Sequence, residues 1–141
     1  MNGERMASDR RAAPGAVLAE LSPGELLDRM TIHELRAARL PGAAQRAVAG
    51  RRLAALTEAR HAALPDTPEI EALIAELREV NEDLWELEND LRAFDARGDF
   101  GAGFVALARA ALALRDRRAE LIRRADELAG AGPGIGKFYR G

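Results

Sequence analysis

The chain has 141 residues, of which 48% are hydrophobic and only 4% are aromatic, so one globular domain with a core made mainly of Leu and Ala is expected. The net charge of −2, with no strongly basic segment, argues against nucleic-acid binding. The absence of cysteine excludes disulfides and thiolate sites, and without a signal-peptide core or an apolar run of about 20 residues we expect a cytoplasmic protein with no membrane partner.

The predicted domain covers residues 21–129 and follows a flexible leader, residues 1–20, which is polar and has no helical periodicity. Ser22 and Glu25 have the spacing of a capping box, and a proline stands between them at the first helical position. The first helix is therefore predicted to start after Ser22 and to end at Leu40, before a Pro-Gly pair.

A second helix is predicted over residues 43–63, where the segment "LPDTP" interrupts the pattern. Its apolar side consists of Ala49, Leu53, Leu56 and Ala63. Thr67 is the predicted N-cap of a third helix over residues 69–97, which at about 29 residues and 1.5 Å per residue is roughly 43 Å long.

The segment "RGDFGAG" turns the chain into a fourth helix, predicted over residues 104–129, and a flexible Gly-rich tail follows over residues 130–141. No run resembles a strand. Four helices joined by short links predict an all-α fold, either a four-helix antiparallel bundle or two packed helical hairpins, with a long third helix.

The third helix carries an apolar stripe that we expect to face the core. It consists of Leu73, Leu77, Val80, Leu84, Leu87 and Leu91. A second line beside this stripe is apolar at its start and polar around the only tryptophan. It consists of Ile70, Ile74, Asn81, Trp85, Glu88 and Arg92.

Arg118 is the only charged residue in the apolar seam of the fourth helix, and Arg109 and Asp116 lie on a neighbouring line. An arginine removed from water is costly unless it is paired, so Arg118 is expected to have an acidic partner, an anionic ligand or a route to solvent. Glu88 and Asp116 are the plausible partners. The polar cluster is either structural, fixing helix register, or the wall of a ligand pocket.

His33 is the single polar member of the first helix's seam, and a hydrogen-bonded boundary histidine competes there with a catalytic one. Trp85 is either a packing residue at the margin of the bundle or a platform for a ligand ring. Glu58 and His61 have the spacing of a di-iron motif, but that chemistry needs the motif twice. Neither a metal nor a cofactor is therefore expected.

Three motifs in order resemble a bacterial domain family of unknown function: "GELLDRMTI", then "NEDLWELENDLR", then "FVALARAALALRDRRAEL". The resemblance implies a small all-α protein whose relatives we associate with bacterial cell-surface sugar or secondary metabolism. It carries over no established activity. The family positions fall on Gly24, Glu25, Asp28, Arg29, Thr31, Asn81, Trp85, Glu88, Asp90, Arg92, Arg109, Asp116 and Arg118. Arg115 stands where the family has Asn, Asn89 where Asp is usual, and the ending "GKFYRG" replaces a more acidic tail.

Two functions follow as hypotheses. The first is a small helical binding or interaction protein, which forms a homodimer and binds a small anionic or sugar-like metabolite. Its ligand-binding candidates are Glu25, Asp28, Asn81, Trp85, Arg92, Arg109 and Arg118. The second is a metal-independent enzyme acting on a small anionic metabolite of bacterial sugar or secondary metabolism, with Glu88 or Asp116 as general base and His33 as proton relay.

Overall fold

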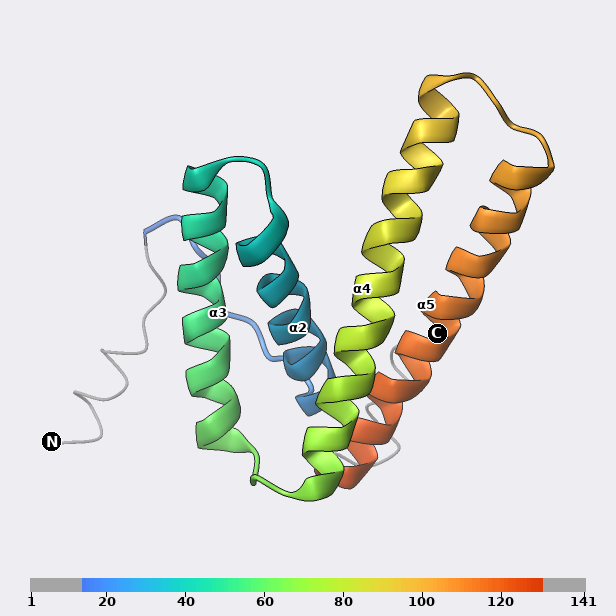
Figure 1. Cartoon of the computed structure of the whole chain (residues 1–141). Coiled ribbons are helices and arrows are strands. Elements are labelled where there is room, and N and C mark those ends of the chain that lie inside the picture. Colours follow the sequence, from blue (N-terminus) through green and yellow to red (C-terminus); the bar gives the residue numbers. More distant parts are fainter. Residues whose placement is uncertain (1–13, 131–141) are drawn as a thin grey trace, which may run out of the picture.

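The computed structural model describes residues 14–130, and in that range the chain forms four helices arranged as two antiparallel hairpins (Figure 1). The helices are α2 (Pro23–Arg39), α3 (Ala43–Ala63), α4 (Pro68–Ala96) and α5 (Ala102–Leu128). The all-α fold with a long third helix is thereby confirmed, and it consists of packed hairpins, α2 with α3 and α4 with α5. Most of the predicted leader and tail lies outside the described residues.

The helix starts follow the cap residues that the sequence indicates. Ser22 Oγ accepts a hydrogen bond from the Glu25 backbone N–H at 3.1 Å, and the Glu25 carboxylate accepts one from the Ser22 backbone N–H at 3.0 Å. Thr67 Oγ1 caps α4 by accepting from the Ile70 N–H at 3.2 Å. The N-cap of α5 is Gly101, which has no side chain to cap the helix. The helix starts at Ala102, two residues earlier than predicted.

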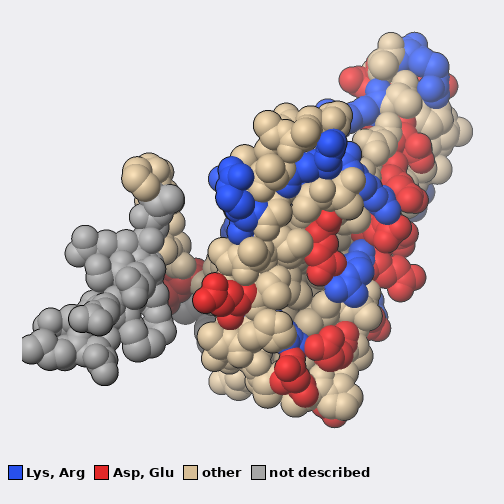
Figure 2. Space-filling view, turned by 60° about the vertical axis from the view of Figure 1, so that its left-hand side comes forward, with Lys and Arg blue, Asp and Glu red and all other residues tan. Residues whose placement is uncertain are grey.

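The core lies where α2 meets α4 and α5. Leu27, Leu77 and Leu121 have no exposed surface there, and burial of each contributes on the order of 1.5–3 kcal/mol. The closest backbone approach of α3 is to α2, and Ala49 and Arg60 are its only buried residues. Figure 2 shows the surface on this side as uncharged over much of its area, with basic side chains toward its upper part and acidic ones toward its lower part.

The α4/α5 hairpin is longer than the α2/α3 hairpin and extends beyond it (Figure 1). The predicted leucine stripe of α4 does face the core, but only its first four members, from Leu73 to Leu84, are buried. Leu87 and Leu91 are partly buried because they pack against α5 in the extended part of the hairpin. The second half of α4 therefore has one helical neighbour where the first half has two.

A close contact holds the start of α2 against the end of α5. Gly24 has no side chain, and a Cβ atom there would overlap the carbonyl oxygen of Ile122. The Gly24 N–H donates to the buried carboxylate of Asp126 at 2.7 Å, so a charge on α5 binds the positive end of α2. This contact sets the spacing of the two helices beside the candidate site.

None of the helices in residues 14–130 is long and apolar enough to cross a membrane.

Candidate functional site

The buried amide of Asn81 joins three helices. Its Nδ2 donates to Asp28 Oδ1 at 2.9 Å and to Thr31 Oγ1 at 2.8 Å, both on α2, and its Oδ1 accepts from Arg118 Nη1 of α5 at 3.2 Å. The Thr31 hydroxyl donates a hydrogen bond to the Asp28 backbone carbonyl at 2.8 Å. Arg118 thus has a polar partner between the helices, but this partner is the Asn81 amide and not the acidic residue expected, and Asp28 completes the network.

Asp28 is the carboxyl group whose titration this environment changes. Burial raises its pKa above the ordinary value of 3.8, and the charge of Glu25 acts in the same direction. The hydrogen bond from Asn81 and the charges of Arg118 and Arg29 lower it, but burial dominates. Asp28 therefore holds its proton more tightly than an exposed aspartate does.

An open groove of about 520 Å³ runs between α2 and α5 over this network. Glu25, Asp28, Arg29, Ile32, His33 and Arg36 line it from α2, and Arg115, Arg118, Ala119 and Ile122 line it from α5. Arg115 and Arg118 are one turn apart on α5, so their guanidinium groups project into the same space opposite α2. The groove is thus lined by four arginines and two carboxylates.

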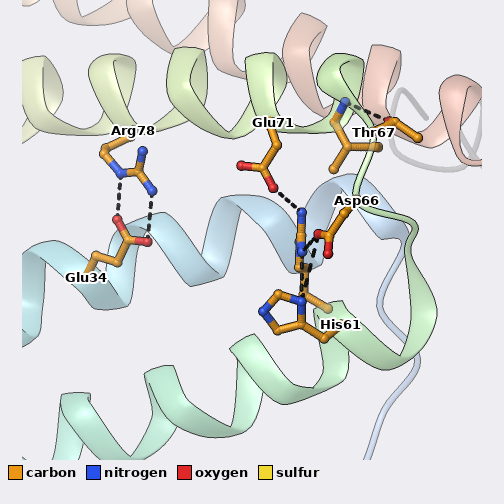
Figure 3. Close-up of polar contacts among 8 residues, drawn as sticks. Glu34, His61, Asp66, Thr67, Glu71 and Arg78 are labelled. Atoms are coloured by element: carbon orange, nitrogen blue, oxygen red, sulfur yellow. Dashed lines mark hydrogen bonds and ion pairs between the residues drawn. The ribbon is translucent and has the colours of Figure 1, made fainter.

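Two arginines of this groove differ from those on other helix faces, while a third, Arg115, pairs with Glu88. Arg78 binds Glu34 through two hydrogen bonds at 2.7 and 3.1 Å, as Figure 3 shows, and Arg117 binds Glu76 at 3.2 Å. In contrast, the guanidinium group of Arg36 forms no ion pair with any residue between 14 and 130. The guanidinium group of Arg118 donates to an amide rather than to a carboxylate. Positive charge in the groove is therefore incompletely neutralised by the protein.

Glu88 is not the partner of Arg118, and this corrects the pairing expected from helical spacing. It accepts from Arg115 at 3.2 Å, and both side chains are about half exposed. Glu88 follows the buried Asn81 by two helical turns on α4 and is exposed to solvent. Asp116 is exposed on the outer side of α5 and does not meet Arg118 either.

The remaining predicted residues are dispersed. Arg92 and Arg109 are exposed and do not line the groove, and Trp85 is half-buried outside it. His33 does line the groove, where its Nδ1 donates to the Arg29 carbonyl at 2.8 Å. Glu25 closes the capping box and also borders the groove.

A second buried polar group is absent from the sequence prediction. Arg60 of α3 is only 3% exposed, and its guanidinium group binds Asp66, the Glu71 carboxylate at 2.5 Å and His61 Nδ1 at 2.9 Å. Figure 3 shows His61, Asp66 and Glu71 turned toward one point between α3 and α4. The signal was present in the sequence, because Arg60 continues the apolar line of the second helix, four residues after Leu56.

Among residues 14–130, no group of three or more His, Asp or Glu side chains could hold a metal ion. No protein-family model, curated protein or solved structure matches the chain. The resemblance to a bacterial domain family therefore stays a prediction, and the case for function rests on the geometry of the groove.

Proposed function

We propose that the chain is a small helical binding protein that holds an anionic or sugar-like metabolite in the groove between α2 and α5. Arg118 and Arg29 supply donors for a carboxylate or phosphate, and the Asn81 amide fixes the position of Arg118. Hydrogen bonds between ionised groups contribute about 1.5–3 kcal/mol each, more than neutral ones, because both charge and direction favour them.

The observation that carries this proposal is that Arg118 binds an amide oxygen and not a carboxylate. The chain as a whole has 23 acidic and 21 basic residues, so acidic partners are abundant, and other arginines use them. Arg118 is half-buried, yet its hydrogen-bond partner in the described part of the chain is a neutral amide. A half-buried cation held this way is available to an anion that comes from outside the protein.

Isothermal titration calorimetry with inorganic phosphate and with citrate at low ionic strength tests the proposal, since salt screens such contacts. Binding is expected with a Kd below about 1 mM. Arg118→Gln should weaken it at least about tenfold, the loss of roughly one charge-assisted hydrogen bond. Arg117→Gln is the matched control, because it removes the same charge from the preceding residue, which pairs with Glu76 on another face. Equal effects of the two substitutions, or no binding of either anion, would contradict the proposal.

The alternative function is a metal-independent enzyme acting on a small anionic metabolite, and the raised pKa of Asp28 is the observation that favours it. In this version Asp28 exchanges a proton with the substrate while Arg118 binds the anionic group. Glu88 and Asp116 lie outside the groove and have no part in it. The ligand identified by calorimetry should then be consumed by the native chain and be bound unchanged by Asp28→Asn.

Homodimer formation also stays a prediction. Its structural support is the outer side of α5, where Val105 and Leu112 are 49% and 60% exposed on a common helical face with Arg109 and Asp116. Two copies of α5 running in opposite directions would bring Arg109 of one near Asp116 of the other, twice about one axis. Sedimentation that shows only monomers across micromolar concentrations would exclude such a dimer.

A further inference from the structure

A second hollow continues the α2/α5 groove along α2. It measures about 290 Å³ and lies between the end of α2 and the start of α3, and it shares His33 and Arg36 with the first. The two hollows therefore adjoin at His33 and Arg36, and together they are called the trough, with α5 beside one part and α3 beside the other.

The charge of the second hollow is positive as well. Arg36 and Arg52 line it, and neither guanidinium group forms an ion pair or a hydrogen bond with a residue in the described range. Their neighbours behave differently: Arg39 binds Glu82 at 2.8 Å, and Arg46 donates to the Leu40 carbonyl at 2.7 Å. No acidic residue lines this hollow, and the Gln45 amide is its only other polar side chain besides His33.

Apolar side chains form the rest of the wall. Leu40, Val48 and Ala49 line the second hollow, and Ile32 and Ile122 line the first. An occupant gains free energy by covering these side chains, which a small fully hydrated anion cannot do. The trough therefore favours a molecule that has an apolar part in addition to its charge.

The spacing of the arginines indicates the length of that molecule. Arg29 and Arg36 are seven residues apart on α2, which is two helical turns or roughly 10 Å along the axis. Arg118 lies at the Arg29 end, because it binds the Asn81 amide that also binds Asp28, and Arg52 lines the second hollow together with Arg36. Positive charge is thus concentrated at two places along one trough.

We propose that the trough holds one elongated molecule with a carboxylate or phosphate group near each end, roughly 10 Å apart, and an apolar segment between them. This rests on the proposed function and names its ligand class. One anionic group binds at Arg29 and Arg118, and the other binds at Arg36 and Arg52. Once the first group is bound, the second binds from a high effective concentration, so the affinity of the whole exceeds that of either half.

Calorimetric titration with linear α,ω-dicarboxylates of increasing length, from succinate to dodecanedioate, tests the proposal. The monocarboxylate of equal chain length is the control for each probe. Affinity is expected to pass through a maximum at an intermediate length and to exceed that of the matched monocarboxylate by at least about tenfold. Arg52→Gln should remove this advantage and leave monocarboxylate binding unchanged. Arg51→Gln, at the adjacent exposed position outside the trough, should preserve it.

Three results would overturn the proposal. Dicarboxylates and monocarboxylates that bind equally well, with both lost in Arg118→Gln, would leave the anion site standing and remove the second subsite. Equal effects of Arg51→Gln and Arg52→Gln would show that general charge attraction, and not the second hollow, gives the advantage. The absence of binding by every probe, phosphate and citrate included, would remove the proposed function together with this one.

Discussion

Arg60 and Arg118 are both arginines that the fold takes largely out of water, and the protein treats them differently. Arg60 is 3% exposed and binds the two carboxylates of Asp66 and Glu71. Arg118 is half-buried and binds the amide oxygen of Asn81. Carboxylates neutralise a guanidinium group, whereas an amide fixes its position and leaves its charge.

This difference distinguishes the polar cluster that stabilises the fold from the polar cluster that is open to a ligand. Removing an arginine from water costs several kcal/mol, and two acidic partners offset that cost at Arg60. At Arg118 the protein supplies Asp28 nearby, but that carboxyl group has a raised pKa because burial disfavours its charge. The Arg60 cluster also ties the end of α3 to the start of α4, and the Arg118 cluster faces an open groove.

The largest expected effect tests the structural cluster. Asp66→Ala combined with Glu71→Ala leaves the Arg60 guanidinium group buried without a counter-charge, and we expect a loss of about 3 kcal/mol in the free energy of unfolding. The value lies at the low end for buried pairs because both carboxylates are exposed and water can replace part of their contribution. Urea denaturation measures it. Glu82→Ala, which breaks the exposed pair with Arg39, is the control and should cost less than about 1 kcal/mol.

The second effect tests the contact that sets the width of the groove. Gly24→Ala places a methyl group against the Ile122 carbonyl and should cost about 2 kcal/mol, because α2 and α5 must move apart. Gly50→Ala is the matched control, since nothing lies near that position within α3, and it should stabilise the protein by about 1 kcal/mol. Thermal melting compares the two. Equal signs would show that the close approach of α2 to α5 does not matter for stability.

The sequence was sufficient to predict the four helices, the N-caps of the first and third, and the first four residues of the core stripe, because each depends on residues a few positions apart. It also marked Arg118 as a charge that needs a partner, since a charged residue in an apolar seam is costly when unpaired. The sequence did not predict which side chains pair across helices. Glu88 shares the helical line of Asn81, but whether that line is covered depends on where α2 ends in space, and periodicity along α4 does not contain this information.

Other features could be predicted only in part. Arg60 follows the same rule as Arg118, a charge on an apolar line, and consistent use of that rule would have found it. Asp126 gives no such signal, because its importance comes from the start of a helix about 100 residues away in sequence. The unpaired state of Arg36 and Arg52 is likewise a property of the assembled surface, since acidic residues are plentiful in the chain and the fold directs them elsewhere.

A smaller effect separates the two arginines directly. Arg118→Gln should change the free energy of unfolding by no more than about 1 kcal/mol, because it removes one hydrogen bond to Asn81. The Asp28 carboxyl group keeps its hydrogen bond from Asn81 in this variant. Urea denaturation of this variant beside the Asp66/Glu71 double variant provides the comparison. A loss as large as that of the double variant would mean that Arg118 serves the fold, as Arg60 does.

The smallest effect is the pH dependence that Asp28 contributes. Its folded pKa is raised above 3.8, so between 3.8 and the folded value the native state binds more protons than the unfolded state does. The contribution of Asp28 to stability is therefore fully present below 3.8 and is lost as pH rises through the folded pKa. Asp28→Asn removes this titration, so its stability relative to the native chain should increase from acidic to neutral pH. Arg29→Gln removes a charge that lowers this pKa, and should move the loss to higher pH. Urea denaturation over this pH range measures both effects. A relative stability of Asp28→Asn that stays level or falls with rising pH would show that burial does not raise the pKa of Asp28.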